Sequence, residues 1–119
     1  MGYNEKLANR IRALLGKRKG FTEKKMFGGV TFLLNGRMCC GVHKDDLIVR
    51  VGAEKYKGAL GLSHTRPMDF TGRPTTGFIF VDPEGWSNDT VLRKWLGMGV
   101  DYVSTIPKKR TSTLTKKRR

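Results

Sequence analysis

Apolar and polar positions alternate on both sides of an Asn-Gly pair in the middle of this chain. On each side every second residue is apolar: Val30, Phe32 and Leu34 before the pair, and Met38, Cys40 and Val42 after it. A period of two is typical of a strand with one buried face. Asn35-Gly36 itself suits the two positive φ angles of a type I′ turn. The pattern therefore predicts an antiparallel hairpin with a two-residue turn.

Further apolar runs predict more strands around this hairpin. Residues 23–27 are expected to form a short strand before it, with Gly28-Gly29 as a turn or bulge between the two. After a turn at Asp45-Asp46, residues 47–51 alternate again and complete an antiparallel meander. Later in the chain, two shorter strands are expected at residues 68–70 and 77–81, and a turn is expected at residues 82–85.

Apolar residues recur at helical spacing in three places. Residues 4–16 predict an amphipathic helix with Asn4 as its N-cap. A short helix is expected over residues 53–60, and a longer one from the N-cap Ser87 to about Ile106. The element order α-β-β-β-β-α-β-β-α predicts an α+β fold. Its antiparallel sheet of five to six strands is expected to be flanked by the N- and C-terminal helices.

Charge is distributed unevenly over the 119 residues, which carry a net charge of +14. Residues 1–106 have the length and apolar content of one domain. Residues 107–119 contain too few apolar residues to offset the entropy of ordering, so they are predicted to form a disordered basic tail. Seven cations lie in this tail: Lys108, Lys109, Arg110, Lys116, Lys117, Arg118 and Arg119.

A second group of cations, Lys17, Arg18 and Lys19, follows the first predicted helix. Other cations of the first 25 residues, including Arg10 and Arg12, extend this basic surface. Together with the tail, the group predicts contact with nucleic acid through phosphates, independent of sequence. The chain is expected to be cytoplasmic and not associated with membranes, since it has neither a long apolar run nor the pattern of a signal peptide.

Cys39 and Cys40 are adjacent in a predicted strand, so one thiol is expected to be buried and the other to face outward. With His43 and His64 they are the candidate soft metal ligands, but the paired spacing of a zinc site is missing. A catalytic cysteine would need a neighbouring base and an orienting group. The sequence therefore predicts no metal, no cofactor and no catalytic residue.

The loop Arg66–Pro74 holds the remaining candidate site. The guanidinium groups of Arg66 and Arg73 could hold an anion around this turn. In the preferred interpretation, Asp69 instead pairs with one of the two arginines and fixes the loop. An enzyme that uses this loop is the least supported functional hypothesis.

Four segments follow one another at compatible spacing: residues 24–29 (Lys-Lys-Met-Phe-Gly-Gly), 35–42 (Asn-Gly-Arg-Met-Cys-Cys-Gly-Val), 49–52 (Val-Arg-Val-Gly) and 66–74 (Arg-Pro-Met-Asp-Phe-Thr-Gly-Arg-Pro). Together they resemble the N-terminal domain of the TfoX/Sxy family, over about residues 3–106. The resemblance implies an α+β fold with an antiparallel sheet and flanking helices. Because a basic tail stands where two-domain relatives carry a helical domain, the chain resembles the single-domain members.

The family's two-domain members regulate competence, so the resemblance implies a non-enzymatic regulatory or adaptor protein with a transcription-related protein partner. The alternative is a general nucleic-acid-binding protein whose affinity comes from the basic tail. A protein partner would distinguish the first hypothesis, and retention of any DNA or RNA would distinguish the second. The sequence leaves open whether the chain is a monomer or a homodimer.

Overall fold

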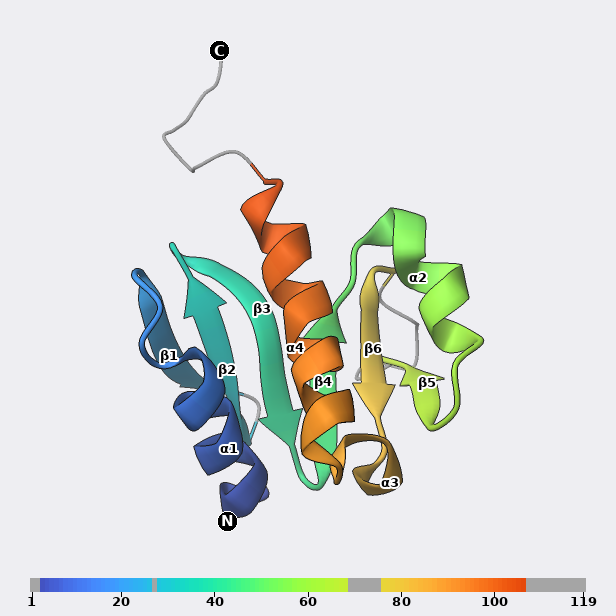
Figure 1. Ribbon diagram of the computed structural model, residues 1–119, viewed down its shortest axis with the longest axis horizontal. Helices are drawn as coiled ribbons and strands as arrows, with labels where there is room; N and C mark the ends of the chain where they lie inside the picture. The colour runs from blue at the N-terminus through green and yellow to red at the C-terminus, as the bar shows by residue number, and fades with distance from the viewer. Residues whose placement is uncertain (1–2, 27, 69–75, 107–119) are drawn as a thin grey trace.

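A computed structural model describes residues 3–26, 28–68 and 76–106 (Figure 1). Within them, six strands form one antiparallel sheet in the order β1-β2-β3-β4-β6-β5. The predicted α+β class is confirmed. The elements are α1 (Glu5–Leu15), β1 (Phe21–Met26), β2 (Gly29–Leu34), β3 (Arg37–His43), β4 (Asp46–Arg50), α2 (Ala53–Leu60), β5 (Thr65–Pro67), β6 (Phe78–Val81), α3 (Pro83–Trp86) and α4 (Asp89–Ser104).

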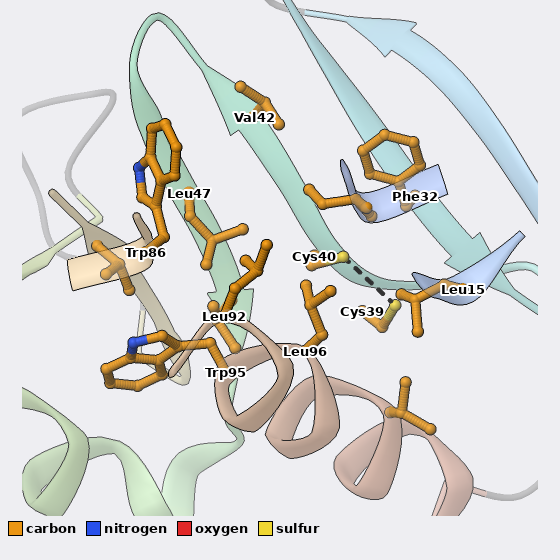
Figure 2. Close-up of a cluster of buried hydrophobic side chains, with 14 of the residues drawn as sticks. Leu15, Phe32, Cys39, Cys40, Val42, Leu47, Trp86, Leu92, Trp95 and Leu96 are labelled. Atoms are coloured by element: carbon orange, nitrogen blue, oxygen red, sulfur yellow. Dashed lines mark hydrogen bonds between the residues drawn. The ribbon is translucent and has the colours of Figure 1, made fainter. Parts of the chain in front are cut away.

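Helices α1 and α4 lie across the same face of the sheet and enclose the core (Figure 1). The apolar stripe of α1, including Leu7 and Ile11, is fully buried. Leu92 and Leu96 of α4 face the alternating buried residues of the central strands (Figure 2). Removing these side chains from water is the main favourable term in folding, and it fixes both helices against the sheet.

The hairpin at Asn35-Gly36 is confirmed. Leu34 and Arg37 lie opposite each other on β2 and β3, so the turn has two residues. The φ angles of Asn35 and Gly36 are 54° and 81°, as a type I′ turn requires. The predicted N-cap of α1 is also confirmed, because the Asn4 side chain accepts a hydrogen bond from the backbone N–H of Leu7 at 3.0 Å.

A β-bulge in β3 overturns the prediction for the two cysteines. Phe32 pairs with Cys40 and Leu33 with Met38, so Cys39 has no partner on β2. The extra residue interrupts the alternation of faces and redirects the side chains. Both cysteines are consequently 0% exposed, with their sulfur atoms 3.8 Å apart (Figure 2). The expectation that one thiol faces outward is wrong.

The turn expected at residues 82–85 is wrong, because Pro83–Trp86 forms the short helix α3. Pro83 occupies the first turn, where a missing N–H costs nothing. The indole of Trp86 donates to the carbonyl of Asp45 at 2.9 Å, which holds α3 against the β3–β4 turn. The last helix begins after Asn88, not Ser87, because the Asn88 side chain accepts hydrogen bonds from two N–H groups of the first turn.

Two strand boundaries differ from the sequence prediction. Strand β1 begins at Phe21, two residues earlier than expected, because Phe21 pairs with Leu34. The strand expected over residues 68–70 is wrong at its first residue, because Met68 follows β5 and is not part of a strand. Residues 69 and 70 lie outside the described part of the chain. Here Thr65–Pro67 forms the strand, since its residues pair with β6. Pro67 is tolerated because β5 lies at an edge of the sheet.

Candidate nucleic-acid interface

Acidic residues gather at one end of helices α1 and α4, and a group of basic residues lies at the other end. Helices α1 and α4 both begin at the end of the molecule that holds the β3–β4 turn and α3, and both end at the opposite one (Figure 1). The first end carries six of the 10 acidic residues of the chain: Glu5, Asp45, Asp46, Asp82, Glu84 and Asp89. Lys17, Arg18 and Lys19 lie at the other end, just after α1.

Arg10, near the acidic end, is paired. Arg10 of α1 forms an ion pair with Asp89 at 2.7 Å and donates to the carbonyl of Ser87 at 3.0 Å. Its guanidinium also lies 5.7 Å from the ring centroid of Trp86. These contacts join α1 to the start of α4, so Arg10 has a structural role.

Arg12 is also occupied, in a two-pronged pair with Glu23 of β1. The two nitrogen–oxygen distances are 2.8 Å and 2.7 Å. The hydrogen bonds from Arg12 lower the pKa of the Glu23 carboxyl. This pair ties α1 to the edge strand and removes Arg12 from the predicted basic surface.

The segment Lys17–Lys19, which we call the basic loop, has a different environment. Its three side chains are exposed and form no ion pair within the described part of the chain. Its backbone is nevertheless held in place, since the N–H of Arg18 donates to the carbonyl of Leu15 at 3.0 Å. Beside it, the N–H of Asn35 donates to the carbonyl of Gly20 at 3.0 Å. The loop thus presents three cations on a fixed backbone next to the hairpin turn.

A cleft of about 330 Å³ opens beside the basic loop. Its lining combines two cations, two polar groups and three apolar side chains: Arg18, Lys19, Asn35, Ser104, Leu34, Val100 and Val103. The structure therefore brings together the loop, the hairpin turn and the C-terminal turn of α4. The sequence analysis assigned Asn35 only to the turn and gave Ser104 no role, because no local pattern shows that these residues meet.

The seven predicted cations of residues 107–119 lie outside the described residues, so their role stays a prediction. The described chain ends at Ile106, two residues after the cleft residue Ser104. The sequence thus continues from this end of the molecule into its most basic segment.

Arg66 of the second candidate site lies between two carboxylates. Its guanidinium is 2.6 Å from Asp46 and 2.9 Å from Asp82, and it lies 5.1 Å from the ring centroid of Phe80. The hydrogen bonds to Asp46 and Asp82 raise the pKa of Arg66. Asp69 and Arg73 lie outside the described residues. Anion binding by this loop stays a prediction, and at Arg66 an anion would compete with two carboxylates.

The cysteines do not form a metal centre with the other described residues, where no group of three or more His, Cys, Asp or Glu is placed to hold an ion. The contact with Cys39 and the burial of the thiol both raise the pKa of Cys40, which is therefore a neutral thiol at ordinary pH. His43, the nearest base in sequence, stacks on Phe80 with ring centroids 6.1 Å apart. These thiols are core residues in the structure.

In the part that the structure describes, no helix is both long and apolar enough to span a membrane. A family model described as the TfoX N-terminal domain matches residues 13–102, which is most of the chain. No curated protein and no solved structure is significantly similar to the chain. The matched range includes the basic loop, the hairpin and most of α4, but it ends before residues 107–119.

Proposed function

The chain belongs to the TfoX N-terminal domain family, and we propose that it is a non-enzymatic regulatory or adaptor protein that contacts nucleic acid independently of sequence. Family membership supports a regulatory role of the competence type at the level of the family. The contact with nucleic acid is the finer part of the proposal, and it depends on the charges of this chain.

The observation that carries the proposal is the group of three adjacent exposed cations on the basic loop. Arg10 and Arg66 near the acidic end are paired with carboxylates, whereas Lys17, Arg18 and Lys19 are exposed without such partners among the described residues. A fold that needed these cations only for stability would be expected to pair them. Phosphates of a polyanion can take the place of the missing carboxylates.

The chemistry of these groups favours binding without sequence readout. Lys and Arg on a loop, followed by a tail rich in the same residues, neutralise phosphates and release counterions. Reading a base sequence requires side chains placed against base edges in a groove. The seven tail cations have no aromatic residue among them, so the tail has nothing on which bases could stack.

A protein partner is the second component of the proposal. A regulator that binds nucleic acid without recognising its sequence needs another protein to direct the regulator to a site. A transcription-related protein would supply that specificity. The expected compartment is the cytoplasm. A pulldown from the native cell, with and without nuclease, separates a direct protein partner from one bridged by nucleic acid.

The binding component is tested with two fluorescent duplexes of equal length and unrelated sequence. The proposal expects equal affinities, and it expects Lys17→Ala/Arg18→Ala/Lys19→Ala to weaken both equally. The control Lys55→Ala/Lys57→Ala/Arg93→Ala removes the same charge from exposed positions outside the basic loop. A strong preference for one duplex, or an equal loss in both triple variants, would contradict the proposal.

A further inference from the structure

The cleft beside the basic loop contains more than a phosphate contact would need. Leu34, Val100 and Val103 provide an apolar floor that continues into the core. Cations alone would suffice to bind a duplex backbone, which stays outside any cleft. A concave site that combines apolar side chains with a few polar and charged groups is instead typical of sites for small molecules.

Two polar side chains stand at the rim of this floor. The amide of Asn35 can both donate and accept hydrogen bonds, and so can the hydroxyl of Ser104. The position of Asn35 is fixed by the type I′ turn and by its backbone bond to Gly20. Ser104 is the last residue of α4. Both residues are therefore held by ordered elements on the lining of the cleft.

Arg18 is exposed and lines the cleft next to this part of the core. The hydrogen bond with Cys40 is the largest cause that lowers the pKa of Cys39, and the charge of Arg18 lowers it further. Cys39 is buried under the C-terminal half of α4, where its carbonyl closely approaches Gly99. Arg18 lines the cleft itself, and a guanidinium there can hold a phosphate or stack on a ring.

From these features we infer that the cleft binds a single unpaired nucleotide of a nucleic-acid strand, with the base on the apolar floor and its phosphate at Arg18 and Lys19. The inference deepens the proposed function and rests on it. The cleft has a volume of about 330 Å³, which is at the small end for ligand sites and suits one nucleotide better than a larger group. A base inside a duplex cannot enter, because its faces are stacked and its edge is paired.

The consequence is a preference for single strands that the basic tail alone would not produce. The tail contacts phosphates, which single strands and duplexes share, whereas the cleft requires a free base. A strand that lacks bases keeps the same phosphates and loses only the group that the cleft takes. Comparing the two strands isolates the contribution of the cleft.

The test measures the affinity of the full chain for oligothymidine and for an abasic strand of equal length. We expect oligothymidine to bind about tenfold more tightly than the abasic strand. Ser104→Trp fills the cleft and should bring the ratio of the two affinities, oligothymidine over abasic strand, close to one. The control Thr90→Trp places the same ring on an exposed position at the other end of α4 and should leave the ratio unchanged.

A second pair of variants keeps the inference falsifiable if the tryptophan disturbs folding. Arg18→Ala/Lys19→Ala removes the cations that hold the phosphate of the bound nucleotide. Its base is then no longer held in the cleft, so oligothymidine should lose more affinity than the abasic strand and the ratio should fall. The charge-matched Lys24→Ala/Lys25→Ala should leave the ratio unchanged. Equal binding of the two strands by the unmodified chain would overturn the inference and leave the proposed function intact. Failure to bind either strand would contradict the proposed function itself. Tighter binding of free thymidine monophosphate than of the strand would overturn the strand as the ligand.

Discussion

At the residue scale, Arg12 and Arg18 show how neighbouring cations acquire different roles. Arg12 reaches Glu23 in two hydrogen bonds at 2.8 Å and 2.7 Å, so its charge serves to hold α1 on the sheet. Arg18, six positions later, is exposed and forms no ion pair with the residues that the structure describes. Substituting Arg12 should therefore affect stability, and substituting Arg18 should affect binding.

The Glu23 pair makes stability dependent on pH. Because Arg12 lowers the folded-state pKa of Glu23 below its ordinary value of 4.5, the contribution is complete above that value and is lost as the pH falls through the lower folded pKa. The pair is partly exposed, so Glu23→Gln should cost less than about 1 kcal/mol near neutral pH. Urea unfolding should show that the difference between wild type and variant shrinks at acidic pH. A difference independent of pH would show that the pair contributes nothing through charge.

The two thiols give a direct test of the bulge in β3. Since Cys39 and Cys40 are both 0% exposed, a disulfide reagent should react with neither in the native protein and with both in urea. The alternation of faces seen in the sequence predicts one reactive thiol instead. One rapidly reacting thiol in the native protein would therefore contradict the buried pair.

At the element scale, α4 lies against the sheet through a close backbone contact. A Cβ on Gly99 would collide with the carbonyl oxygen of Cys39, whereas a Cβ on Gly97 would meet no atom within 4 Å. The bulge and the glycine thus allow β3 and α4 to approach each other. Helix propensity alone does not distinguish the two glycines, because each is unfavourable in a helix interior.

Alanine at these two positions should have opposite effects. Gly97→Ala should stabilise the protein by about 0.5–1 kcal/mol, since it reduces the entropy of the unfolded chain without a clash. Gly99→Ala should destabilise it by about 1–3 kcal/mol, because β3 or α4 must move. Thermal unfolding of the two variants measures both. Equal effects would mean that α4 does not lie this close to β3.

The start of α4 offers a second matched pair. Asn88→Ala should cost about 1 kcal/mol, because two backbone N–H groups of the first turn lose their acceptor. Ser87→Ala should change the free energy of unfolding much less, although the sequence pattern favoured Ser87 as the cap. A larger loss in the Ser87 variant would place the helix start one residue earlier than in the structure.

Elements with strong local patterns were predicted well, and those decided by distant contacts were not. The hairpin was predicted because Asn35-Gly36 and period-two alternation are local signals. Helix α3 was missed because Trp86 is held by the carbonyl of Asp45, more than forty positions earlier in the chain. Strand β5 was misplaced for the same reason, since pairing with β6 selects its residues.

At the scale of the whole molecule, the fold class could be predicted from the sequence, but the cleft could not. Lys17, Arg18 and Lys19 were recognised as a charge run. That Arg18 and Lys19 lie beside Asn35 and Ser104 follows only from the packing of α1, the hairpin and α4 on one sheet. The same packing separates paired from unpaired cations, which composition alone does not show.

The parallel arrangement of α1 and α4 also contributes to this polarity. Both helices end near the basic loop, and a helix C-terminus carries a partial negative charge that favours nearby cations. Each such contribution is modest and is screened by salt. The exposed cations of the basic loop therefore remain available to a polyanion.

The measurement that tests the central claim most directly is a salt titration of duplex binding by the full chain and by a chain that ends at Pro107. If about five to seven phosphates are neutralised, the slope of log K against log salt for the full chain should be about −4.5 to −6. The shortened chain should keep its folded circular dichroism spectrum and give a much flatter slope. Residues 107–119 hold seven cations and the basic loop three, so the longer chain is expected to make most of the phosphate contacts. Equal affinities and equal slopes for the two chains would contradict that expectation.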